Sequence, residues 1–281
     1  MRIGRRLFGI LALGYCILTG AHSRADRPYA MPDAPSPEVL TRGKRVYNYV
    51  CAPCHGKDGK GRGPVSATIR VKPRDFTSGI YKYRTTRSGQ LPTVEDIYRS
   101  VVLGFHATAM PAFRQLHPDD IYAVVRYIMT FSPRFSDPDE YPLQVVELSP
   151  PVPWSPESVA RGRAIYLNMQ CWQCHGVAGR GDGPAAKTLR DQWGNPMHMP
   201  DLTNPQTIKR ARTREDIYLI FTTGLNGTPM PSYRSVLSDE DRWHLTNYIW
   251  GLINGYATYD GTTLKDLQTV PAARNATPQQ P

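Results

Sequence analysis

Two stretches of the chain carry apolar residues at the three- and four-residue spacing of an amphipathic helix. The apolar stripes consist of Ile121, Val124, Val125 and Ile128 in the first stretch and of Leu245, Tyr248, Ile249 and Leu252 in the second. We therefore predict two helices that each bury one face, one near the middle of the chain and one near its end.

A matching helix start precedes each of these stretches. Ser36-Pro37-Glu38 and Ser155-Pro156-Glu157 place a capping hydroxyl, a first-turn proline and an acidic residue in order. A glycine and a tyrosine four residues apart share one face in both helices, at Gly43 and Tyr47 and at Gly162 and Tyr166. Because a glycine inside a helix costs about 1 kcal/mol relative to alanine, we expect a close helix crossing at each glycine, with the closing helix packed on the opening one.

Each half also predicts a shorter helix between these two. The expected capping residues are Thr93 with Asp96 and Thr213 with Asp216, and the expected terminating residues are Gly104 and Gly224.

The two halves of the chain are copies of one module. Both contain the pattern C-x-x-C-H, at Cys51-Ala52-Pro53-Cys54-His55 and at Cys171-Trp172-Gln173-Cys174-His175. Glycines and a proline follow at identical offsets, namely Gly56, Gly59, Gly61, Gly63 and Pro64 in the first copy and Gly176, Gly179, Gly181, Gly183 and Pro184 in the second. This register predicts a tandem repeat.

The C-x-x-C-H pattern predicts covalent haem attachment. Its two thiols can form thioethers to the haem vinyl groups, and the imidazole of the adjacent histidine can ligate the iron. A zinc ribbon would separate its two cysteine pairs by about 15–20 residues, and a redox disulfide would leave the following histidine unexplained in both copies. We therefore predict that Cys51, Cys54, Cys171 and Cys174 hold two haem c groups, with His55 and His175 as iron ligands.

The sixth position of each iron decides between electron transfer and catalysis. Met110 follows His55 at the same distance as Met230 follows His175, and both lie in a T-x-M-P loop. We predict that the two methionines are the distal ligands. The other candidates lack a counterpart in the other copy and are interpreted as packing or surface residues: His106, His117, Met129, Met197, His198, Met199 and His244.

On these motifs the chain resembles the class I c-type cytochromes, in a dihaem form made of two such modules. The resemblance rests on C-x-x-C-H-G, G-x-G-x-G-P, the M-P loop and the crossing of the first and last helices. It implies an all-α fold of two tandem cytochrome c domains. It also implies that the carbonyl of the loop proline accepts a hydrogen bond from the proximal histidine, which pairs Pro64 with His55 and Pro184 with His175.

The remaining segments of the 281-residue chain flank or link the modules. Residues 1–25, with a basic start and an apolar run, predict a cleaved export signal, and a retained membrane anchor is the alternative. Residues 132–154 are rich in proline and predict an extended linker between domain 1, residues 36–131, and domain 2, residues 155–256. Residues 257–281 lack apolar periodicity and predict a disordered tail.

The formal net charge of +10 is unevenly distributed. Residues 26–135 carry 17 basic and 9 acidic side chains, whereas residues 155–256 carry 11 and 9. In an exported protein, a basic first module favours redox proteins with an acidic docking surface as partners and argues against nucleic acid. A partner complex in the membrane is compatible with the same surface.

Two irons with both axial positions filled favour electron transfer, because a saturated iron cannot bind a substrate without losing a ligand. We therefore expect a periplasmic carrier, not an enzyme, that passes single electrons between redox partners. The alternatives are a dihaem enzyme of the peroxidase or thiosulfate dehydrogenase type, and the electron-transfer subunit of a larger oxidoreductase complex. A peroxidase needs an available iron position, and the thiosulfate chemistry of this family resembles the use of a cysteine ligand, for which the mature chain has no spare cysteine.

Overall fold

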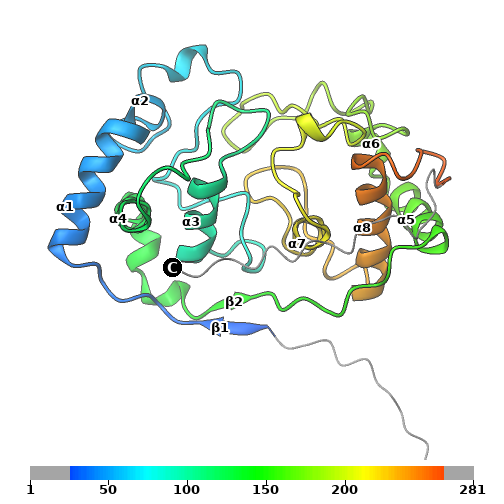
Figure 1. Ribbon diagram of the computed structural model, residues 1–281, viewed down its shortest axis with the longest axis horizontal. Helices are drawn as coiled ribbons and strands as arrows, with labels where there is room; N and C mark the ends of the chain where they lie inside the picture. Colours follow the sequence, from blue (N-terminus) through cyan, green and yellow to red (C-terminus); the bar gives the residue numbers. More distant parts are fainter. Residues whose placement is uncertain (1–25, 263–281) are drawn as a thin grey trace, which may run out of the picture.

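The computed structural model describes residues 26–262. Within this range the chain forms two helical modules side by side (Figure 1). The first contains α1 (Pro37–Val46), α2 (Ala52–His55), α3 (Val94–Leu103) and α4 (Pro118–Met129), and the second contains α5 (Pro156–Asn168), α6 (Trp172–His175), α7 (Arg214–Thr223) and α8 (Asp239–Ile253). Shorter elements are a π-helical turn at Tyr47–Cys51 and 3-10 turns at Ser66–Thr68, Pro133–Ser136, Pro138–Glu140 and Pro205–Thr207.

The helix starts and ends predicted from the sequence are confirmed. Each capping hydroxyl accepts a hydrogen bond from the backbone N–H three residues on, which satisfies a donor that the helix itself leaves unpaired. The capping residues are Ser36 for α1, Thr93 for α3, Ser155 for α5 and Thr213 for α7. Gly104 and Gly224 end α3 and α7 with φ angles of 58° and 67°, a left-handed region that glycine adopts without steric cost.

The opening and closing helices of each module cross at the predicted glycines. A Cβ atom added to Gly43 of α1 would overlap the carbonyl oxygen of Ala123 in α4, and one added to Gly162 of α5 would overlap that of His244 in α8. The crossing buries Tyr47 and Tyr166 completely or nearly so. The prediction that each closing helix packs on its opening helix is therefore confirmed.

The predicted linker is packed on both modules. Its strand β2 (Leu143–Val145) pairs antiparallel with β1 (Arg27–Tyr29), and Leu143 is fully buried in the core of the first module. Further on, the hydroxyl of Ser149 accepts a hydrogen bond from Nε1 of Trp243 in α8 at 2.9 Å. The proline content of the linker predicts an extended backbone, which the structure has. It does not predict whether apolar side chains of the linker are buried in the core of a module.

The segment after α8 is also ordered over its first residues. Ala257 is buried, and the carbonyl oxygen of Tyr259 accepts hydrogen bonds from the hydroxyl of Tyr248 and from Nε of Arg163. The prediction of a disordered tail is therefore wrong for residues 257–262, because backbone groups of this polar segment bind side chains of α5 and α8. The rest of that tail and the predicted export signal lie outside the described residues.

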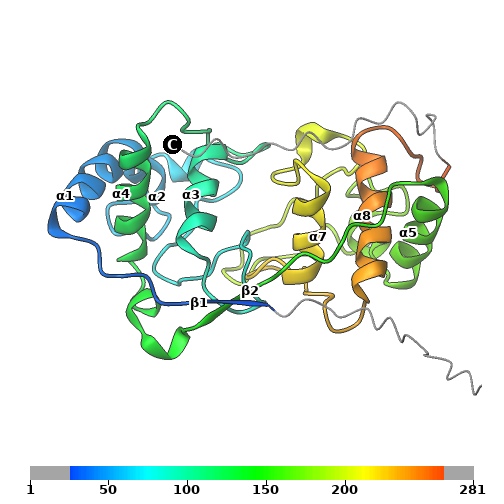
Figure 2. The same cartoon turned by 60° about the horizontal axis from the view of Figure 1, so that its bottom comes forward.

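The modules meet where α3 and α7 end, in the middle of the molecule (Figure 2). Arg84 of the first module donates hydrogen bonds to the carbonyl oxygens of Thr223 (2.6 Å) and Gly224 (3.4 Å), and Arg212 of the second donates to that of Leu103 (3.0 Å). Each arginine thus satisfies carbonyl groups at the C-terminus of the other module's helix, where a positive charge is favoured. Part of the basic excess of the first module is therefore directed inward.

Candidate haem-binding sites

Both C-x-x-C-H motifs form one short helical turn that is held from the opening helix. α2 and α6 end at Gly56 and Gly176, which have φ of 79° in both modules. The hydroxyl of Tyr47 donates to the carbonyl oxygen of Gly56 at 2.7 Å, and that of Tyr166 donates to Gly176 at 2.6 Å. The buried tyrosine therefore fixes the position of the cysteines and histidine relative to the core in each module.

The glycine-rich loop then folds back over the motif. The N–H of Gly61 donates to the carbonyl oxygen of His55 at 2.8 Å, and Gly181 makes the same bond to His175 at 2.8 Å. A Cβ atom at Gly61 would overlap the carbonyl oxygen of Pro73. The glycines are therefore required because a second stretch of backbone passes directly over the loop.

The two predicted methionine loops share the same backbone structure. The N–H of Met110 donates to the hydroxyl of Thr108 (3.1 Å) and that of Met230 to the hydroxyl of Thr228 (3.2 Å). The carbonyl oxygen of each methionine also accepts a bond from the residue that follows the glycine ending α3 or α7, at 3.1 and 3.0 Å. The T-x-M-P pattern thus encodes one rigid turn in both modules.

The second module brings its predicted haem residues together around one cavity. Cys171, Cys174, His175 and Met230 all line a cavity of about 210 Å³, with further walls from Leu202, Ile217 and Phe221. Burial lowers the pKa of His175 to about 4, so its imidazole stays neutral, as iron ligation requires. Its Nδ1 is buried and has no hydrogen-bond partner among residues 26–262. The apolar walls and this donor set fit a haem.

The first module arranges the same residues differently. Cys51 packs in an apolar cluster with Tyr47, whereas Met110 packs in a second cluster, and Tyr81 borders both. The ring of Phe76 stacks on the imidazole of His55, with 4.4 Å between ring centroids.

The expected hydrogen bond from the proximal histidine to the loop proline is not found. Nδ1 of His55 lies 3.0 Å from the carbonyl oxygen of Arg74, not from that of Pro64. The reason is that residues 73 and 74 pass over Gly61 and so bring another carbonyl group to the imidazole. The buried Nδ1 of His175 is likewise not bonded to Pro184.

The first cysteine of each motif lacks the lowered pKa of a reactive thiol. All four motif cysteines are unbridged. Burial, together with the neighbouring cysteine, raises the pKa of Cys51 and of Cys171 to about 12, whereas reactive C-x-x-C thiols have lowered pKa values. The described residues contain no cluster of three or more His, Cys, Asp and Glu side chains that could hold a bare metal ion. The raised pKa values of these two thiols argue against a reactive thiolate pair.

The unmatched histidines and methionines serve several structural roles. His117 caps α4, His244 is buried and bonded to Ser158, and Met129 lies in the core of the first module. Nη2 of Arg212 donates a hydrogen bond to Nε2 of His106 across the module boundary. His198 contacts Arg70 of the other module and, with Met197 and Met199, lines the second cavity.

Sequence reasoning missed the residues of the first module that reach the second cavity. Lys82 and Tyr83 line it together with Lys209 and Arg210 of the second module. The sequence signal for Lys82 and Tyr83 is that the segment between residues 78 and 92 is rich in Tyr, Arg and Lys. This composition does not indicate what the segment contacts, because its partner lies in the other module.

The fold is that of the c-type cytochromes, and the chain belongs to this family with two cytochrome c domains. The profile of the family "Cytochrome C oxidase, cbb3-type, subunit III" matches residues 38–128, and that of the family "Cytochrome c" matches residues 159–252. Two such domains imply two covalently attached haem c groups, which supply reversible one-electron chemistry at iron.

Two known proteins define the relationship further. A chain of the Kuenenia stuttgartiensis reducing HAO-like protein complex Kustc0457/Kustc0458 is 43% identical, with a TM-score of 0.74, and the match covers 79% of this chain and 100% of that one. Photosystem II extrinsic protein V of Cyanidium caldarium is 29% identical over 104 residues. That match covers 34% of this chain and 64% of the photosystem protein.

Proposed function

We propose that the chain transfers single electrons through two haems with His/Met ligation, His55 with Met110 and His175 with Met230. The observation that carries this proposal is the identical backbone of the two methionine loops, each held by its own threonine. A methionine that merely fills a core does not need the same rigid turn twice. His/Met ligation raises the reduction potential of a haem and leaves the iron saturated.

The setting that we propose is the periplasm, reached by way of the export signal predicted in residues 1–25. No helix within residues 26–262 is long and apolar enough to cross a membrane. The similarity to a subunit of an HAO-like protein complex favours a role as the electron-transfer subunit of a larger oxidoreductase. In that role the partner carries out the catalysis, and this chain passes electrons to or from it.

A redox titration of the purified dihaem protein, followed by absorption, tests the proposal. We expect two one-electron steps and, in the oxidised protein, the weak far-red band of a methionine bound to iron at an intensity that corresponds to two sites. Carbon monoxide should bind neither reduced iron. His/Met ligation would be contradicted if carbon monoxide bound to the reduced wild-type protein, or if the oxidised protein showed no far-red band.

A further inference from the structure

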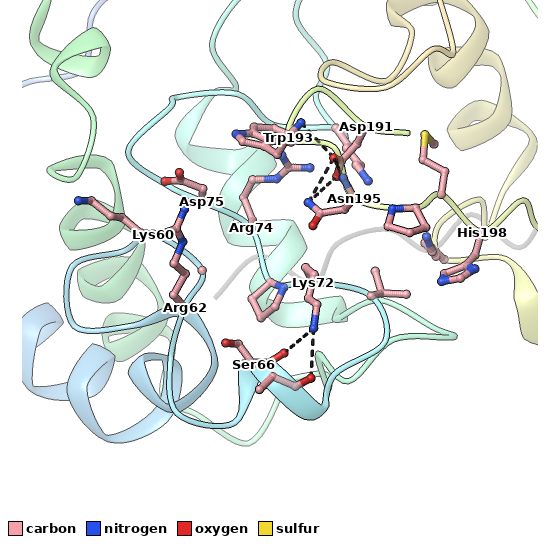
Figure 3. Close-up of a pocket in the computed structure, with 18 residues that line it drawn as sticks. Lys60, Arg62, Ser66, Lys72, Arg74, Asp75, Asp191, Trp193, Asn195 and His198 are labelled. Carbon is pink, nitrogen blue, oxygen red and sulfur yellow. Dashed lines mark hydrogen bonds between the residues drawn. The ribbon is translucent and has the colours of Figure 1, made fainter. Parts of the chain in front are cut away.

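A cavity of about 310 Å³ lies between the two modules, apart from the proposed iron ligands (Figure 3). Residues 60–82 of the first module form one wall and residues 191–209 of the second form the other. Six basic side chains line it: Lys60, Arg62, Lys72, Arg74, Lys82 and Lys209. Only two carboxylates face them, Asp75 and Asp191.

Both carboxylates are engaged in local turns. Oδ1 of Asp75 accepts hydrogen bonds from the N–H and the hydroxyl of Thr77, at 2.9 and 2.6 Å. Asp191 accepts from the N–H groups of Trp193 and Asn195, at 3.0 and 2.9 Å. Within residues 26–262 neither carboxylate forms a salt bridge, so the cavity keeps a clear excess of positive charge.

Three of these cations, Arg74, Lys82 and Lys209, are half-buried in the wall of the cavity. The guanidinium of Arg74 lies over the ring of Trp193, 4.3 Å from its centroid, as Figure 3 shows. Burial lowers the pKa of Lys82 to about 8, with repulsion from Arg74 and Lys209 adding to the effect, and burial also lowers the pKa of Lys209. No salt bridge among the described residues includes any of the three. Partial removal from water destabilises a cation that has no anionic partner, and a bound anion would offset that cost.

We propose that this intermodule pocket binds an oxyanion group, a carboxylate or a phosphate, between Arg74, Lys82 and Lys209. A planar guanidinium and two ammonium groups can donate to separate oxygens of such a group. Lys60, Arg62 and Lys72 line the same cavity and add long-range attraction for an anion. The proposal goes beyond electron transfer and does not depend on which residues ligate the irons.

Two sources can supply this chemistry. Lys82 and Lys209 also line the cavity of the second module, so a propionate of the haem held there can occupy the pocket. The other source is a free oxyanion from solution. In either case the anion would join residues of both modules, so that it would stabilise their docking.

Calorimetric titration of the purified dihaem protein with inorganic phosphate, against sodium chloride at equal ionic strength, tests for the free anion. Lys82→Met and Lys209→Met should each weaken phosphate binding by about tenfold or more, because each removes a charge-assisted hydrogen bond. Lys82→Arg should retain it. Lys44→Met removes the same charge from exposed α1 and should leave binding unchanged.

Resonance Raman spectra of the same variants test for the haem carboxylate. If phosphate does not bind the wild-type protein, the propionate bands should shift in Lys82→Met and Lys209→Met but not in Lys44→Met. The proposal is overturned if neither phosphate binding nor a propionate shift is found, or if Lys44→Met behaves like the two pocket variants. Neither readout measures electron transfer, so failure here is separate from failure of the proposed function.

Discussion

Arg99 of α3 and Asp216 of α7 form a salt bridge across the module boundary, with 2.7 Å between Nη2 and Oδ1. The Asp216 side chain is only 5% exposed, whereas that of Arg99 is 42% exposed. The carboxylate also accepts the N–H of Arg212 at 2.9 Å. One buried charge therefore orders the backbone of its own module and binds the neighbouring one.

Removing Arg99 should leave a buried charge with too few partners. We expect Arg99→Leu to lower the free energy of unfolding by about 1–2 kcal/mol, less than for a fully buried pair because Arg99 is partly in water. Arg42→Leu, which breaks a more exposed pair with Asp120, should cost less than about 1 kcal/mol. Unfolding in urea, which is uncharged and does not screen ion pairs, measures both. Equal losses would mean that the boundary pair contributes no more than a surface pair.

Without Arg84, we expect the two modules to unfold separately instead of together. Arg84→Met leaves the carbonyl groups of Thr223 and Gly224 without their donor across the boundary, and each such loss costs about 1–3 kcal/mol. We expect differential scanning calorimetry to show one transition for the wild-type protein and two resolved transitions for the variant. An unchanged single transition would show that other contacts couple the modules.

The sign of the effect tests the helix crossing at Gly162. If only helix propensity mattered, Gly162→Ala would stabilise the protein by about 1 kcal/mol. Because the new methyl group would overlap the carbonyl oxygen of His244, we expect a net destabilisation of about 1–3 kcal/mol instead. Thermal unfolding gives the sign directly, and a gain in stability would refute the close crossing.

The ligand assignment predicts independent effects at the two irons. Met110→Ala should halve the far-red band and open one reduced iron to carbon monoxide, and Met230→Ala should do the same at the other iron. The double variant should lose the band entirely. If the band of either single variant stays at full intensity, another residue holds that sixth position.

A charge reversal at Lys57 tests whether a partner with an acidic surface docks on the first module. Lys57 is suitable because it is exposed beside the first motif and lies outside the intermodule pocket. Lys57→Glu should slow reduction by an acidic redox protein at low salt, whereas Lys187→Glu in the second module should change it less. The difference should shrink as salt shortens the screening length below about 10 Å. Stopped-flow rates without any salt dependence would indicate a neutral interface.

The sequence by itself determined the features that depend on local chemistry. Thioether attachment needs two cysteines and a histidine at fixed spacing, and the caps at Ser36 and Thr93 satisfy donors only three residues away. The apolar stripes and the glycines at positions 43 and 162 likewise predicted which helices cross, because helical periodicity is readable over a dozen residues. Both domains, their all-α class and their cofactors were therefore predictable.

The tertiary structure alone decided how the modules dock and what the basic segment between residues 70 and 84 does. Arg84 and Thr223 are 139 residues apart in the sequence, and no local pattern shows that an arginine will meet a helix end in another module. The same holds for Nδ1 of His55, whose partner depends on which backbone segment passes over Gly61. Hydrophobic periodicity and motif spacing indicate what each segment buries or binds on its own. A pocket lined by basic side chains from both modules forms only when the two folded modules pack together, so no local pattern predicts it.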